Sequence, residues 1–302
     1  MKYLLIALLM LMGCGNKGEP DVKGEIPADL EAKNVLYEHL IQDHQDSDGF
    51  ILSSHCDSLL FTSLMGVAID EGMIDITAAR DDDGRWYRRP AKDCLSSGGS
   101  KSSISKDMIL GLMWYIWKHK LVDEAQMLHD YIEDNNYIIG EHDGSVDGRS
   151  RVTMSPAMLS TITQIIYKLD GRNYSEKRRI PVLWTTPSPG FESHLTALHL
   201  TLRREVYGHL SVNGAGVLRK LYDREPSNPL FAYAAGDYGK TIAILSSEVL
   251  YPSNRLPTSG DRCAGWLPER AEDDYAPCPQ DGKTHTGGDF LFLYSLMFEK
   301  GR

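Results

Sequence analysis

The sequence predicts an all-α protein, because amphipathic helical patterns follow one another along most of the chain and period-2 strand patterns are almost absent. Apolar residues recur at three- and four-residue spacing in about ten segments after Pro27. Very short turns join some of these segments, whereas long polar connections rich in Trp, Asp, Arg and Tyr join others. We therefore expect an array of helical hairpins with its long loops at one rim.

The first residues of the chain, MKYLLIALLMLMGCG, contain an apolar run from residue 4 to residue 12. The run is too short to cross a bilayer, so it predicts a signal peptide. Its end, Leu11-Met12-Gly13-Cys14, resembles the lipobox of bacterial lipoproteins. That resemblance implies removal of residues 1–13 and a lipid on Cys14, which would anchor the mature chain in the cell envelope. Gly15 after the cysteine implies the outer membrane, if the host is a Gram-negative cell.

Residues 14–26 are polar and contain glycine, which favours a flexible tether between the lipid and the domain. No Pro/Gly/Ser linker divides the remainder, so residues 27–302 are expected to form a single helical domain. The formal net charge is −10, and no basic stripe is present. An acidic chain repels a phosphate backbone, and we expect no nucleic-acid partner.

Each helix is expected where apolar residues lie on one face. Pro27 fits the first turn of the first helix, Gly72 is a candidate C-cap for the second, and Ser155-Pro156 is a start signal. The expected ranges are 27–45, 58–72, 105–119, 122–135, 155–169, 192–207, 213–224, 228–235, a segment after Asp237, and 287–298.

The connection at residues 80–107, RDDDGRWYRRPAKDCLSSGGSKSSISKD, is much longer than a routine loop. Trp86 and Tyr87 lie between three acidic and four basic residues, a composition unlike that of disordered chains. We expect a site-bearing loop, and the alternative is a solvated loop whose charges neutralise one another. Further long loops are expected at residues 137–153, 178–193 and 251–288.

This alternation of short turns and long loops over residues 27–299 resembles the α/α-toroid enzymes, a helical scaffold shared by many glycoside hydrolases and polysaccharide lyases. The resemblance implies a complete or partial toroid that acts on a polysaccharide. A hydrolase needs two carboxyl groups. A lyase needs a base such as Tyr or His and a group such as arginine that neutralises the uronate carboxylate, and Tyr87 with His142 or His194 could supply these roles beside Arg88 and Arg89.

The loops supply candidates for these roles. The candidate catalytic residues are Asp107, Asp57 and Asp143, and the candidate substrate-binding residues are Trp86, Tyr87, Arg88, Arg89, His142 and Trp266. Structural alternatives stay open, because Asp57 and Asp107 lie where helices begin and the arginines can pair with neighbouring aspartates. A non-catalytic lipoprotein that binds a glycan or a protein partner is the alternative function.

Four cysteines follow Cys14, and an even number in an exported chain favours disulfides. Three pairings are possible, and spacing favours Cys56 with Cys94 and Cys263 with Cys278. A zinc site is the rival interpretation, but no CxxC or HExxH motif gives ligand spacing, so we expect no metal. The chain has no Walker loop or GxGxxG, and we expect no cofactor.

Overall fold

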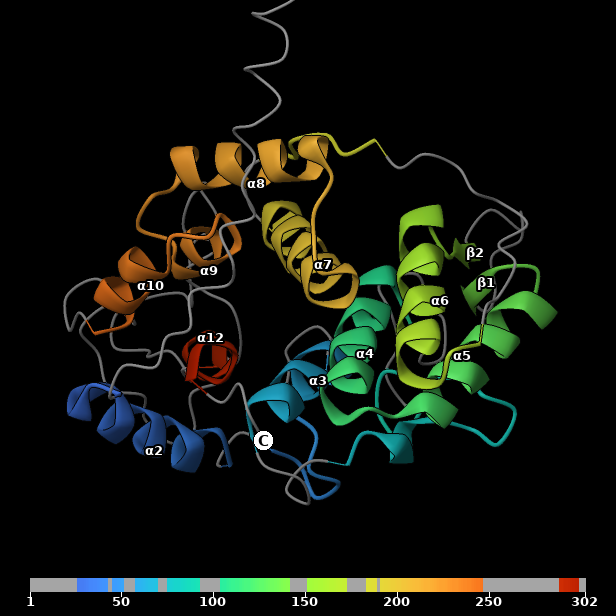
Figure 1. The fold of residues 1–302 in the computed structure, drawn as a ribbon. Coiled ribbons are helices and arrows are strands. Elements are labelled where there is room, and N and C mark those ends of the chain that lie inside the picture. The colour runs from blue at the N-terminus through green and yellow to red at the C-terminus, as the bar shows by residue number, and fades with distance from the viewer. Residues whose placement is uncertain are drawn as a thin grey trace, which may run out of the picture.

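The computed structural model describes residues 26–42, 45–51, 58–69, 75–92, 104–141, 151–172, 183–188, 191–246 and 288–298. The regular secondary structure of these residues is helical apart from one short two-stranded sheet, which confirms the all-α prediction (Figure 1). Several predicted features lie outside the described residues. They are the signal peptide, Cys14 and most of the tether, the four other cysteines, and the site candidates Asp57, His142, Asp143 and Trp266.

Every helix expected from apolar spacing is present, with ends that differ by a few residues. The helices are α2 (Ala28–Gln42), α3 (Ser58–Ala68), η1 (Thr77–Ala79), α4 (Lys106–His119), α5 (Val122–Asp134), α6 (Pro156–Asp170), α7 (Phe191–Tyr207), α8 (Val212–Arg224), α9 (Pro229–Ala234), α10 (Tyr238–Leu245) and α12 (Gly288–Phe298). The start signal at Ser155 is confirmed, since its side chain accepts the Met158 N–H and Pro156 follows in the first turn.

The expected loop 137–153 contains a β-hairpin, which corrects the prediction of an irregular connection there. Strands β1 (Ile138–Glu141) and β2 (Arg151–Thr153) pair in antiparallel fashion. Ile139 is buried in the hydrophobic core, and Val152 packs against that core. The strands are too short for an alternating pattern to stand out in the sequence. We attribute their pairing to burial against the helices, which a local sequence pattern does not show.

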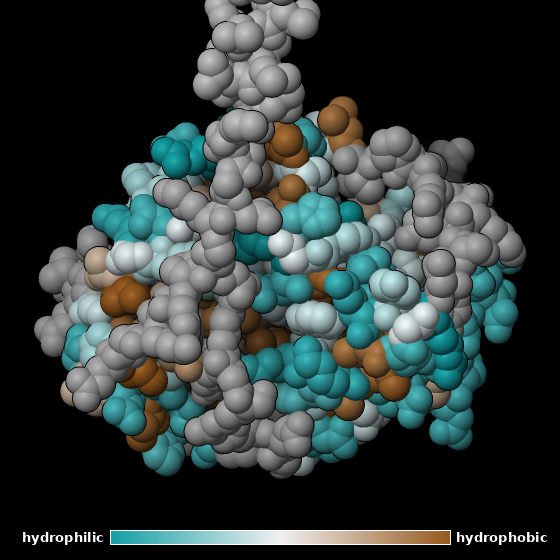
Figure 2. Space-filling view, viewed as in Figure 1, coloured by the Kyte–Doolittle hydropathy of each residue, from teal (hydrophilic) through white to brown (hydrophobic). Residues whose placement is uncertain are grey.

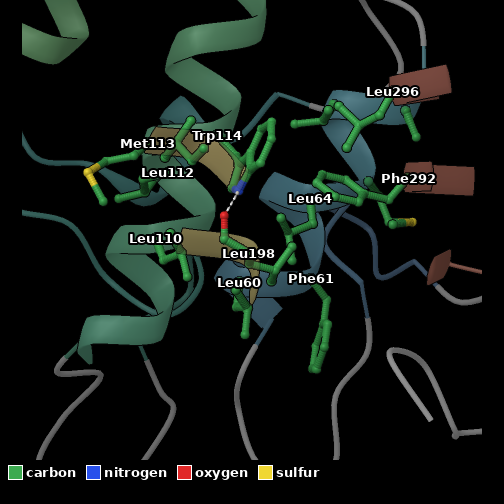
Figure 3. Packing of buried hydrophobic residues seen from close by; sticks show 14 of the residues in the cluster. Leu60, Phe61, Leu64, Leu110, Leu112, Met113, Trp114, Leu198, Phe292 and Leu296 are labelled. Carbon is green, nitrogen blue, oxygen red and sulfur yellow. Dashed lines mark hydrogen bonds between the residues drawn. The ribbon is translucent and has the colours of Figure 1, made fainter. Parts of the chain in front are cut away.

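The core is built around α3, whose side chains are all buried. Helix α4 packs along α3 on one side, and α12 packs on the other (Figure 3). Trp114 of α4 links three helices, because its indole N–H donates to the Leu198 carbonyl of α7 at 3.2 Å and its ring meets Phe292 of α12 edge-on at 5.1 Å. Helix α12 also contacts α2, so the last described helix returns to the first.

The long loops do not share one rim in the described part of the chain, which corrects that expectation. Residues 75–92 lie at the lower right of Figure 1, beside α5, whereas residues 183–188 lie at the top, beside α8. Each segment is tied to its own neighbouring helix by side-chain contacts, and those contacts decide where the loop lies.

Candidate functional site

The loop 75–92 is fastened to α5 at several points. Arg80 pairs with Trp86 as an isolated β-bridge, and the Arg80 guanidinium forms an ion pair with Glu124 of α5 at 2.9 Å. Gly84 adopts a positive φ of 88°, and a Cβ at this position would lie 2.9 Å from the Met127 carbonyl oxygen. Only glycine tolerates both the conformation and the close approach. The loop is therefore a fixed element rather than a solvated connection.

Trp86 is a core residue, which corrects its expected role as a sugar-stacking surface. Its side chain is only 2% exposed, and it belongs to the main hydrophobic cluster. Neither ring face is open to a ligand. The indole ring anchors the loop by burying its apolar surface against the helices. The sequence does not distinguish a buried tryptophan that fixes a loop from an exposed tryptophan that stacks on a sugar, because both occur in polar loops.

Tyr87 follows Trp86 in this loop and is half-buried. We name the set of residues around it the Tyr87 cluster: Asp81, Arg85, Tyr87 and Lys92. The Tyr87 hydroxyl donates to Asp81 at 2.7 Å, and the Lys92 ammonium forms an ion pair with the same carboxylate. The Arg85 guanidinium lies 5.0 Å and the Lys92 ammonium 4.4 Å from the centre of the Tyr87 ring. Both are cation–π distances.

Protonation in the Tyr87 cluster follows from these contacts. Burial and the hydrogen bond to Asp81 raise the pKa of Tyr87 to about 12. Hydrogen bonds from Lys92 and Tyr87 lower the pKa of Asp81. At neutral pH the carboxyl is therefore ionised and the phenol is neutral. A phenol that keeps its proton is poorly suited to the role of a lyase base, which was the expectation for Tyr87.

The other described candidates are more enclosed than expected. Arg88 is buried and Arg89 is half-buried, and each interacts with another group. Asp107 is half-buried in the first turn of α4. No hydrogen bond or ion pair of its side chain occurs with any residue in the described ranges. Among the predicted site residues that the structure describes, it brings together only members of the loop 75–92.

Trp184 forms a second candidate site that the sequence reasoning did not select. It lies in the irregular segment 183–188, and both of its backbone hydrogen-bonding groups bind the Asn213 side chain of α8, at 2.6 and 2.9 Å. Farther along this segment, the Pro187 carbonyl accepts from Arg224 at 3.0 Å and the Ser188 carbonyl accepts from Ser193 at 2.8 Å. The segment is irregular but held at three positions.

The ring of Trp184 is partly exposed, with one side supported by the protein. It meets the His199 ring edge-on at 5.0 Å. His199 shares a 3.1 Å hydrogen bond with Thr161, which also accepts from Arg203. Burial and the Arg203 charge lower the pKa of His199 to about 3, so the imidazole in contact with Trp184 is neutral at physiological pH. The ring thus has a fixed, uncharged support.

Exposed apolar side chains adjoin both partners of the Trp184–Asn213 pairing. Leu183, which precedes Trp184, is 78% exposed, and Val212, which precedes Asn213, is 93% exposed. Figure 2 shows hydrophobic surface at the upper edge of the molecule, over α8. The sequence signal that could have indicated this site is a tryptophan near prolines and threonines in a long loop. Only the contacts with α7 and α8 show that this ring, unlike that of Trp86, is left partly open.

Within the described ranges, no group of three or more His, Cys, Asp or Glu residues is arranged to hold a metal ion. No helix in the same ranges is long and apolar enough to span a membrane. The fold and these two sites define the class of protein only as a helical domain with charged and aromatic surface loops. No family model matches the chain, and no curated protein or solved structure is found to be similar to it.

Proposed function

We propose that this chain is a lipid-anchored protein of the cell envelope that binds a polysaccharide, with Trp184 as its aromatic platform. The observation that carries the proposal is the partly exposed Trp184 ring on a segment held at three positions. Sugar rings present flat apolar faces bordered by hydroxyl groups. A fixed aromatic ring beside the exposed hydroxyls of Thr185 and Thr186 matches both features.

Truncation of the platform tests this proposal. We expect Trp184→Ala to weaken polysaccharide binding by roughly 30-fold, corresponding to about 2 kcal/mol for a central aromatic contact. The measurement is an affinity titration of the full chain against the polysaccharide that responds best in a screen of cell-wall and capsular polysaccharides.

Tyr167→Ala is the matched control, because Tyr167 is an aromatic residue of α6 that is 48% exposed. It should leave binding unchanged. Equal losses in the two variants would argue against Trp184, and a screen in which no polysaccharide binds would defeat the proposal as a whole.

The lipid anchor is a separate part of the proposal, and it rests on Leu11-Met12-Gly13-Cys14. Cys14→Ser removes the sulfur that would carry the lipid. We expect this variant to appear in the soluble fraction or to keep its signal peptide, whereas the wild-type chain partitions with membranes. Acyl chains contribute about 0.8 kcal/mol per buried CH₂, so the difference in partitioning should be large. Processing and partitioning identical to the wild type would contradict the lipobox interpretation.

Cleavage of the same polysaccharide is the second candidate function. It is favoured by Asp107, a half-buried carboxylate at a helix start that makes no ion pair in the described part of the chain. A carboxylate can act as the base or nucleophile of such a cleavage reaction. New reducing ends would indicate a hydrolase, and unsaturated uronate ends would indicate a lyase. Binding without either product supports the non-catalytic function.

We also propose that the helical array is a partial α/α toroid. The contact of α12 with both α2 and α3 supports this arrangement, because a ring requires the two ends of the helical series to meet. An experimental structure with the ends of the series far apart would contradict it.

A further inference from the structure

The Tyr87 cluster carries more positive than negative charge. Two cationic groups, Arg85 and Lys92, lie beside the Tyr87 ring. One carboxylate, that of Asp81, forms an ion pair with Lys92. No carboxylate in the described ranges forms an ion pair with Arg85. One oxygen of the nearby Asp83 accepts the Arg85 backbone N–H at 3.0 Å, which ties that carboxylate to the turn.

We infer that the Tyr87 cluster is a binding site for an anionic group, a carboxylate, sulfate or phosphate ester, held by Arg85 and Lys92 at the edge of the Tyr87 ring. Charge-assisted hydrogen bonds to guanidinium and ammonium groups are among the stronger polar contacts of proteins. The aromatic ring keeps water from part of both cations, which strengthens their attraction for an anion. The site goes beyond the proposed glycan platform, because residues 75–92 lie beside α5 whereas residues 183–188 lie beside α8 (Figure 1).

The cluster is organised before any ligand arrives. Lys92 adopts a left-handed backbone with φ of 52°, and its N–H donates to the Arg89 carbonyl at 3.1 Å. This conformation is unfavourable for a residue with a Cβ and persists only where surrounding contacts hold it. The contacts of the Lys92 side chain with the Asp81 carboxylate and the Tyr87 ring are of this kind. A site of this kind loses little conformational freedom on binding.

The Asp81 carboxylate competes with an incoming anion for the Lys92 ammonium. One of its carboxylate oxygens accepts from Tyr87 at 2.7 Å, and the other contacts Lys92. An incoming anion has to share Lys92 with this carboxylate or displace it. Loss of the Asp81 charge should therefore strengthen anion binding, whereas loss of the Arg85 charge should weaken it. A purely structural role for the cluster predicts neither change.

The experiment is a titration of the full chain in detergent with inorganic phosphate and, separately, with a glucuronate oligosaccharide. We expect Arg85→Gln to weaken binding of the responding anion roughly threefold to tenfold, and Asp81→Asn to strengthen it by a similar factor. The asparagine can still accept from the Tyr87 hydroxyl, which preserves the local fold. Binding should weaken as salt is added.

Arg219→Gln and Asp223→Asn are matched controls, because these residues form an exposed ion pair on α8 with a 3.0 Å contact. Both should leave anion affinity unchanged. A response to glucuronate alone identifies an acidic saccharide, and a response to phosphate alone identifies a phosphate ester. Equal affinities in all four variants, or a loss in both cluster variants, would overturn the inference. Trp184→Ala should not affect binding of inorganic phosphate, which separates this site from the glycan platform.

Discussion

Replacement of Trp86 with alanine is expected to lower the free energy of unfolding by about 3–5 kcal/mol, the usual cost of removing a large aromatic side chain from a core. Trp86 is 2% exposed and anchors the loop 75–92 to the helical core. Its removal leaves a cavity and frees the loop that carries the Tyr87 cluster. Chemical denaturation followed by circular dichroism measures the change.

Trp86→Phe is the matched comparison for that variant. The indole N–H of Trp86 has no hydrogen-bond partner among the described residues. Phenylalanine therefore fills less of the buried volume but loses no hydrogen bond. We expect it to cost about 1–2 kcal/mol, much less than alanine. A Trp86→Ala chain of nearly wild-type stability that had lost polysaccharide binding would contradict the buried anchor and restore the stacking role expected from the sequence.

Gly111→Val is expected to lower the free energy of unfolding by at least about 2 kcal/mol, as overpacking of a close helix contact does. Gly111 lies where α4 packs on α3. A Cβ there would lie 3.0 Å from the Leu60 carbonyl oxygen and 3.2 Å from the Leu60 Cα. These are backbone atoms of a buried helix, so the two helices would have to move apart. Thermal and chemical unfolding measure the loss.

Gly216→Ala is the control for that prediction. Gly216 lies within α8, and a Cβ there would meet nothing within 4 Å. Alanine is a better helix former and restricts the unfolded chain, so we expect a gain of about 0.5–1 kcal/mol. The opposite signs of the two changes in unfolding free energy separate a steric effect at Gly111 from a general effect of replacing glycine in helices. Tolerance of valine at position 111 would show that α3 and α4 are farther apart than described here.

The candidate sites were predicted less well than the helices, for a reason that Trp86 and Trp184 make clear. Both tryptophans lie in long polar loops, and composition alone favoured Trp86 because of its charged neighbours. The structure buries Trp86 and leaves Trp184 partly open. Exposure depends on contacts with residues that are distant in the sequence, such as Glu124 of α5 for the loop 75–92 and Asn213 of α8 for Trp184. The disulfides and four of the nine candidate site residues lie outside the described residues and stay predictions.

The all-α class and the position of each described helix could be predicted from the sequence alone, because apolar spacing and capping residues such as Ser155 act over a few residues of chain. The places of the loops, the pairing of β1 with β2 and the accessibility of the aromatic rings could be seen only in the folded structure. Those outcomes rest on contacts between distant segments, such as Arg80 with Glu124 and Trp184 with Asn213. A polar loop satisfies its local preferences in many positions, and long-range packing selects one of them.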